Sequence, residues 1–211
     1  MDGDQTNNNP IQTNLSIEGI LNSTVEFLTT SQTTPPAPSV VVEALLIAEK
    51  TAKRTKVRHS YCQLHGTWRL GFVTGTKKSR QKAGVILGSG RFLPSWVKIH
   101  LSYLQSESDT DRGTVQNSVE LGGLQLVLTG PIKWNSKTNR LAFDFTQMKV
   151  SFFGLKVYSG YIRGGQEREV QFDDSSVKEQ AFFTYFLVQD RYIAARGRGG
   201  GLALWTKIKD S

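Results

Sequence analysis

Cysteine is almost absent from this chain, since Cys62 is the single one among 211 residues. One cysteine cannot close an intramolecular disulfide, which excludes a disulfide-stapled scaffold and predicts a reducing compartment. Long apolar runs are missing as well: Val40–Ala48 and Ala181–Val188 fall well short of the ~20 residues that a membrane-spanning helix needs. The sequence therefore predicts no transmembrane helix.

The N-terminus, MDGDQTNNNP, lacks the features of a targeting segment. It has neither a basic start followed by an apolar core nor the Arg-rich, acid-poor composition of a transit peptide. We therefore expect a protein that is made and kept inside a cell. Residues 1–38 also contain no Lys or Arg but four acids, so the net charge of +8 leaves +12 on the remaining chain.

This positive charge is densest from Glu49 to Lys82, a segment that contains ten Lys or Arg residues and a single acidic residue. Such a field favours polyanions, and the bases near the end of an expected helix are candidates for contact with an anionic membrane surface. The bland alternative is a solvated basic surface. Nucleic acid is a weaker alternative, because no aromatic-basic platform accompanies the run. The candidate membrane-surface residues are Lys50, Lys53, Arg54, Lys56 and Arg58.

Two helices are expected before the main body. Ser16 can cap a helix that ends near Leu28, and Ser39 can cap a second one that closes in the basic run. Between them the segment TTSQTTPPAP opposes helix continuation. The chain thus divides into residues 1–38, a mobile tail with a short helix and a Pro/Thr linker, and residues 39–211, the main domain with its leading basic helix.

After Leu64 the apolar period changes from 3.6 to 2, which predicts half-buried antiparallel strands. About eight or nine strands joined mostly by short turns are typical of a barrel or a sandwich. The expected strands lie near 67–72, 97–103, 115–121, 124–134, 140–147, 149–158, 181–189, 192–195 and 201–208.

The sequence contains no complete motif for phosphate binding, zinc binding or nucleophilic catalysis. Gly71–Lys77 has the wrong spacing for a phosphate loop. His59, Cys62 and His65 lack a fourth ligand for structural zinc. No pair of nucleophile and base can be named, so the sequence predicts a protein that is not an enzyme and needs no metal or cofactor.

Two segments at the ends of the strand region are more informative. Leu64, Gly66, Trp68 and Leu70 form L-x-G-x-W-x-L, and Ala194–Leu204 reads AARGRGGGLAL. In a closed barrel the first and last strands are neighbours, so a late Arg could stack over Trp68. Together with the apolar strand near Ala142–Phe145, these motifs resemble the plastid lipid-associated protein, or fibrillin, family over roughly residues 40–208.

The resemblance implies a mainly β fold: a single lipocalin-like antiparallel β-barrel of about eight or nine strands with one or two N-terminal helices. It also implies a protein of cyanobacteria or plastids that associates with thylakoid membranes or lipid globules and binds or carries prenylquinones, carotenoids or other lipids. The location would be cytoplasmic, peripheral to the thylakoid, or in the plastid after loss of a transit peptide. The sequence departs from the common plant pattern at Ile193 and Arg198, where Arg and an acidic residue are usual.

The candidate ligand-binding residues are the apolar side chains expected inside the barrel together with one late arginine. They are Trp68, Leu70, Phe72, Ile99, Leu101, Phe143, Phe145, Phe152 and Arg196. An apolar lipid or pigment would bind there if these side chains do not fill the interior. The alternative, by analogy of fold only, is a bilin chaperone or lyase whose anionic pigment would contact Arg196 and Arg198.

Overall fold

The computed structural model describes residues 16–30, 32–75, 90–106, 109–162, 164–177 and 179–208. The expected mobile tail, residues 1–15, lies outside them. In chain order the elements are α1 (Ile17–Thr30), α2 (Pro38–Thr55), η1 (Tyr61–Leu64), β1 (Gly66–Thr74), β2 (Gly90–Phe92), β3 (Lys98–Gln105), β4 (Arg112–Leu121), β5 (Leu124–Asn135), β6 (Arg140–Phe143), β7 (Gln147–Phe152), β8 (Leu155–Tyr161), α4 (Gly165–Val170), β9 (Ala181–Val188), β10 (Tyr192–Gly197) and β11 (Leu202–Lys207).

Eight of the strands close into an antiparallel barrel. Their hydrogen-bonded order is β4-β3-β1-β11-β10-β9-β6-β5, and β5 pairs back onto β4. The predicted single antiparallel barrel is therefore confirmed. The predicted pairing of the first and last barrel strands is also confirmed, because Trp68 lies opposite Lys207 and Phe72 opposite Leu204.

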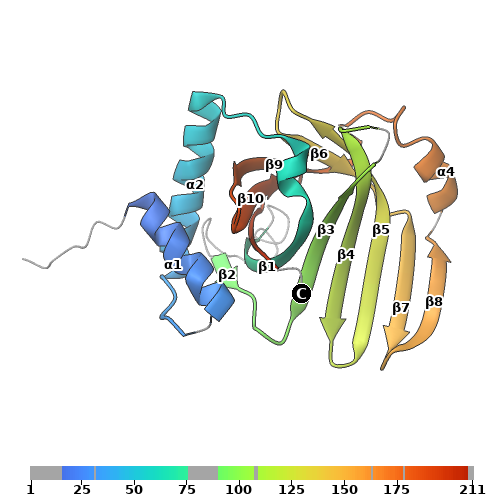
Figure 1. The fold of residues 1–211 in the computed structure, drawn as a ribbon, viewed down its shortest axis with the longest axis horizontal. Helices are drawn as coiled ribbons and strands as arrows, with labels where there is room; N and C mark the ends of the chain where they lie inside the picture. The colour runs from blue at the N-terminus through green and yellow to red at the C-terminus, as the bar shows by residue number, and fades with distance from the viewer. Residues whose placement is uncertain are drawn as a thin grey trace, which may run out of the picture.

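Three further strands lie outside this ring. The short β2 pairs with β1, while β7 and β8 continue the sheet beyond β5 and project past the barrel at the lower right of Figure 1. The single strand expected over 149–158 is wrong, because the chain turns at Phe153 and Gly154, both of which have positive φ. We use the name extension for β7, β8, residues Leu124–Thr129 of β5 and the β4 residues paired with them.

Gly130 marks the point where barrel and extension separate. Above it, β5 pairs with β6 through Ile132–Asn135, and below it with β7 through Leu124–Thr129. The chain bends from β6 to β7 directly against this position, where a Cβ would lie 1.9 Å from the Asp144 carbonyl oxygen. Only glycine fits so close an approach, and the strand expected to reach Gln147 therefore ends at Phe143.

The barrel interior is packed with aromatic side chains. Trp68, Tyr103 and Tyr185 are almost fully buried, and the two tyrosine hydroxyls are hydrogen-bonded at 2.5 Å. The Trp68 indole N–H donates to the Leu64 carbonyl at 2.7 Å, and the Lys207 ammonium lies 5.2 Å from its ring centroid. The residue that stacks on Trp68 is thus a lysine of the last strand and not the expected arginine.

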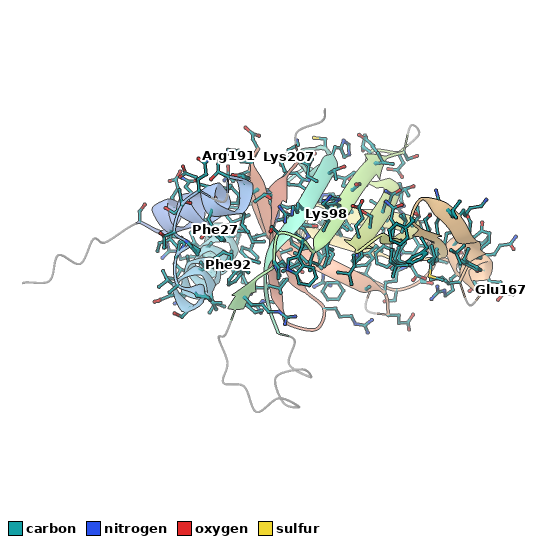
Figure 2. The ribbon with its side chains drawn as sticks, turned by 90° about the horizontal axis from the view of Figure 1, so that it is seen from below. Phe27, Phe92, Lys98, Glu167, Arg191 and Lys207 are labelled. Atoms are coloured by element: carbon teal, nitrogen blue, oxygen red, sulfur yellow. The ribbon has the colours of Figure 1, made fainter. Side chains whose placement is uncertain are left out.

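The two long helices cover the outer face of β1, β9, β10 and β11, on the left of Figure 1. Their apolar stripes, with Leu21 of α1 and Leu45 of α2, share one core cluster with the outward-facing Leu204. Phe27 of α1 packs edge-to-face on Phe92 of β2 with ring centroids 5.2 Å apart (Figure 2). This second core fixes the helices to the barrel.

Helix boundaries follow the sequence in part. Ser16 caps α1 as expected, with its Oγ accepting the Gly19 N–H at 3.1 Å. Ser39 does not cap α2, because Pro38 already occupies the first turn and no side chain caps that end. The short helix α4, which connects β8 towards β9, was not expected from the sequence.

Candidate functional site

The inner side of the barrel can be followed outward onto the extension. Directly opposed residues of antiparallel strands place their side chains on the same face. Trp68, which points into the barrel, lies opposite Leu101, which in turn is opposite Asn117. The same row continues through Leu128 and Met148. The inner face of the barrel and this face of the extension are therefore one continuous surface.

This surface is apolar beyond the closed barrel as well. The row next to the one above passes from Ile99 through Val119 and Leu126 to Val150, and it ends at the exposed Tyr158. Side chains here are half-buried, whereas the deeper residues of the barrel are fully buried. We call this half-buried apolar surface the extension face. Its residues are Ile99, Val119, Leu126, Leu128, Met148 and Val150.

An aromatic cluster lies where the barrel passes into the extension. The Phe143 ring is 5.3 Å from Phe145 and 5.1 Å from Phe183, and Phe183 is 5.4 Å from Trp205. Phe145 and Phe183 are half-buried. The extension face therefore begins at an aromatic cluster that remains partly accessible.

Asn117 is the polar residue of this apolar row. It stands between Leu101 and Leu128, and its Oδ1 is buried without a hydrogen-bond partner. A buried acceptor that is left unpaired is costly to the fold. Sites for apolar ligands commonly contain one such group, which fixes the orientation of the ligand.

Six of the expected ligand-binding residues lie on the inner side of the barrel or the extension. Trp68, Leu101 and Phe143 are buried in the core, while Leu70, Ile99 and Phe145 are half-buried nearer the extension. The first three are packing residues, whereas Ile99 belongs to the extension face and Leu70 and Phe145 lie beside it.

Phe72 does not point into the barrel as expected. The pairing of β1 with β11 shifts register between Leu70 and Phe72, and this bulge moves Phe72 to the outer side. There it is fully buried against the helices in the second core. Strict alternation along the strand therefore failed at Gly71.

The prediction that Phe152 points into the barrel is also wrong. It stands at the end of β7 and is 51% exposed. It lies opposite Leu124 and Leu155, at the tips of two hairpins. It therefore belongs to the outermost row of the sheet and not to the barrel interior.

Arg196 points to the helix layer. Its Nε donates to Glu49 Oε1 at 2.7 Å and its Nη1 to the Gly200 carbonyl. Burial tends to raise the pKa of Glu49, but hydrogen bonds from Arg196 and Lys53 outweigh it and hold the pKa below its usual value. Arg198 likewise donates to the Glu179 and Gln180 carbonyls. Both guanidinium groups are committed to protein acceptors, so the bilin alternative gains no support from them.

The expected membrane-surface bases lie at the end of α2 and just beyond it. Lys50, Lys53 and Arg54 are exposed on the helix, and Lys56 ends it in a left-handed conformation. Arg58 follows, also exposed. In Figure 1 this end of α2 is at the top, opposite the hairpin tips of the extension.

A separate hollow of about 600 Å³ lies outside the barrel between the helices and the β9–β10 connection. Leu21, Ala52 and Phe186 give it apolar walls, while Glu18 and Arg191 are among its charged lining residues. His59 also lines it, and burial lowers the pKa of this imidazole. Unlike the extension face, the hollow has charged side chains in its lining.

No group of three or more metal-ligating side chains occurs in the described part of the chain. Cys62 is a free, exposed thiol that contacts Ser60. None of the described helices is both long and apolar enough to cross a bilayer.

Comparison with known proteins adds little. No protein-family model matches the sequence, and no curated protein matches it either. One solved structure that is similar is a redesigned β-barrel, with 10% sequence identity, coverage of 73% of this chain and 98% of that chain, and a TM-score of 0.34. The barrel assignment rests on the strand pairing of this chain itself.

Proposed function

We propose that the protein is a non-enzymatic carrier of an apolar molecule, a prenylquinone, carotenoid or other lipid, which binds on the extension face. The observation that carries the proposal is the continuity of the inner apolar surface beyond the closed barrel. Inside the ring, aromatic side chains fill the space, so we place the ligand outside the core. Outside it, half-buried aliphatic side chains offer apolar surface whose burial drives binding.

The aromatic cluster and Asn117 give this surface its polarity pattern. A flat conjugated ring could stack on the half-buried Phe145 and Phe183, while a hydroxyl of the ligand, which a quinol carries and a quinone does not, would donate to the unpaired Asn117 Oδ1. The aliphatic tail would then lie along Leu126 and Val150 towards β8. This arrangement favours binding of a lipid that has one polar ring and an aliphatic tail over binding of a plain hydrocarbon.

The test is titration with a short-chain prenylquinol, followed by calorimetry and by tryptophan fluorescence. Leu126→Gln and Val127→Gln form a matched pair, because the two residues are neighbours on β5 and face opposite sides of the sheet. Both are half-buried, so the substitutions perturb the fold to a similar degree.

We expect Leu126→Gln to weaken binding about tenfold or more, and Val127→Gln to leave it unchanged. Equal effects of the two variants, or no saturable binding by the parent, would contradict the proposal. Loss of binding in Ala52→Gln alone would place the ligand in the hollow beside the helices instead.

A further inference from the structure

The two hairpins at the free end of the extension carry a cluster of exposed apolar side chains. In the register, Leu121 is opposite Leu124, Leu124 opposite Phe152, and Phe152 opposite Leu155. Phe153 and Leu155 are 73% and 75% exposed. Trp96, in the turn before β3, is 67% exposed and lines the same end. The tip cluster comprises Trp96, Leu121, Leu124, Phe152, Phe153 and Leu155.

Phe153 is unfavourable for the isolated fold in two respects. It is a bulky residue with φ of +45° at a turn position where glycine or asparagine is preferred. Its large ring is also left mostly in water. Strained backbone conformations of this kind cluster at functional sites. The Phe153 N–H donates to the Gly123 carbonyl at 2.8 Å, which joins the two hairpin turns into one unit.

Trp96 is held in place by the sheet beside it. The Arg69 guanidinium donates to the Ser95 carbonyl at 3.1 Å and so fixes the turn that carries the indole. Trp68, Trp134 and Trp205 are the other three tryptophans, and all of them are buried. Tryptophan is enriched where proteins meet the membrane–water interface, so an exposed indole on this turn suits contact with a bilayer.

Positive charge lies just behind the tip cluster. In the outer-face row next to the tip, Lys98 on β3 and Lys156 on β8 stand at the two flanks (Lys98 is labelled in Figure 2). Lys149 stands in the following outer row. Glu120 is the acid among these rows, 3.7 Å from Lys98, so the three lysines outnumber it. Behind the tip, a hollow of about 410 Å³ lined by Trp96 and Lys98 has room for a polar head group.

We infer that the tip cluster docks into the surface of an anionic lipid bilayer, with its apolar side chains at acyl-chain depth and the lysines among the head groups. The hairpins project past the barrel in Figure 1, so they can reach a flat surface before any other described element does. Two turns and one indole are few side chains for a protein partner, because a stable interface uses ~20–30 residues a side. A bilayer needs only a few.

Tip docking and ligand binding on the extension face involve different residues, so either can fail without the other. The bilayer contact then lies at the end of the molecule opposite the α2 bases (Figure 1). Tip docking depends on apolar burial and persists in salt, whereas docking through the α2 bases would be screened.

The experiment uses vesicles of phosphatidylcholine and phosphatidylglycerol in equal parts, at low and at high salt. Flotation measures binding, and a blue shift of tryptophan emission reports transfer of Trp96, since the other tryptophans are already buried. The variants are Phe153→Asn, the combination of Lys53→Gln, Arg54→Gln and Lys56→Gln, and the control Val170→Ser, which changes an exposed apolar residue on α4.

We expect Phe153→Asn to weaken binding about tenfold at both salt concentrations while its Tm stays equal or rises. The α2 variant and Val170→Ser should bind as the parent does at high salt. Three results would overturn the inference: no binding by the parent, binding lost only in the α2 variant, or a parent that is dimeric and becomes monomeric on Phe153→Asn. The last would identify the tip cluster as a contact between two copies.

Discussion

Arg196 of β10 and Glu49 of α2 form a bidentate ion pair that links the helix layer to the barrel, although the two residues are 147 positions apart in the chain. The Glu49 side chain is 8% exposed, so its charge depends on these donors. Lys53 adds a third hydrogen bond from one turn further along the helix. The fixed arginine positions α2 over the barrel.

Glu49→Gln should lower the free energy of unfolding by about 2–3 kcal/mol at neutral pH, because it leaves Arg196 without its counter-charge. The pKa of Glu49 in the fold lies below its usual value of 4.5, so the pair is complete above that pH and is lost as pH falls through the lowered pKa. The difference between variant and parent should therefore shrink in acid. Urea unfolding at a series of pH values measures it, and Lys53→Gln, at a mostly exposed end, is the control with little effect.

Tyr103→Phe removes one hydroxyl of the buried pair and should cost about 1–2 kcal/mol, because the Tyr185 hydroxyl loses its partner. Burial raises the pKa of both phenols above the usual value of 10. Their contribution to stability is therefore present below pH 10 and is lost as pH rises past it. In an alkaline titration followed by tyrosinate absorbance, these two groups should ionise only with unfolding; ionisation in the folded protein would contradict the packing described.

Trp68→Ala should lower the free energy of unfolding by about 3–5 kcal/mol, since the indole is fully buried and its N–H is hydrogen-bonded to Leu64. Denaturant unfolding measures the change. A loss below about 1 kcal/mol would mean that Trp68 does not fill the barrel, contrary to the packing argument.

Asn117→Leu should separate stability from ligand preference. Removing an unpaired buried polar group in favour of an apolar one should stabilise the fold by about 1 kcal/mol. The same change should weaken binding of a hydroxyl-bearing ligand more than that of its hydrocarbon analogue. If both ligands respond alike in calorimetry, Asn117 plays no part in recognition.

The barrel itself could be predicted from the sequence, because alternation over short segments and matched glycine-rich ends report strands that pair at closure. The extension could not. Phe153 and Gly154 break what looked like one strand, and only Gly154 gave a turn signal. Gly130 gave no sign that β5 pairs with two different strands along its length.

The candidate site was predicted in part. Leu70, Ile99 and Phe145 lie on the inner side of the sheet, as alternation predicted, but their place beside or on the extension face was not expected. Phe72 was lost to a bulge that alternation cannot reveal, and Arg196 to a long-range partner, Glu49. Asn117 was missed although alternation places it on the same face as Val115 and Val119, because the sequence does not show that its Oδ1 is buried without a partner.

Native mass spectrometry of the protein isolated from its own cell shows directly whether an apolar molecule is bound on the extension face. We expect one apolar molecule per chain in the parent and in Val127→Gln, and its loss in Leu126→Gln. Retention of the molecule in Leu126→Gln, or a parent that carries none, would contradict binding on the extension face.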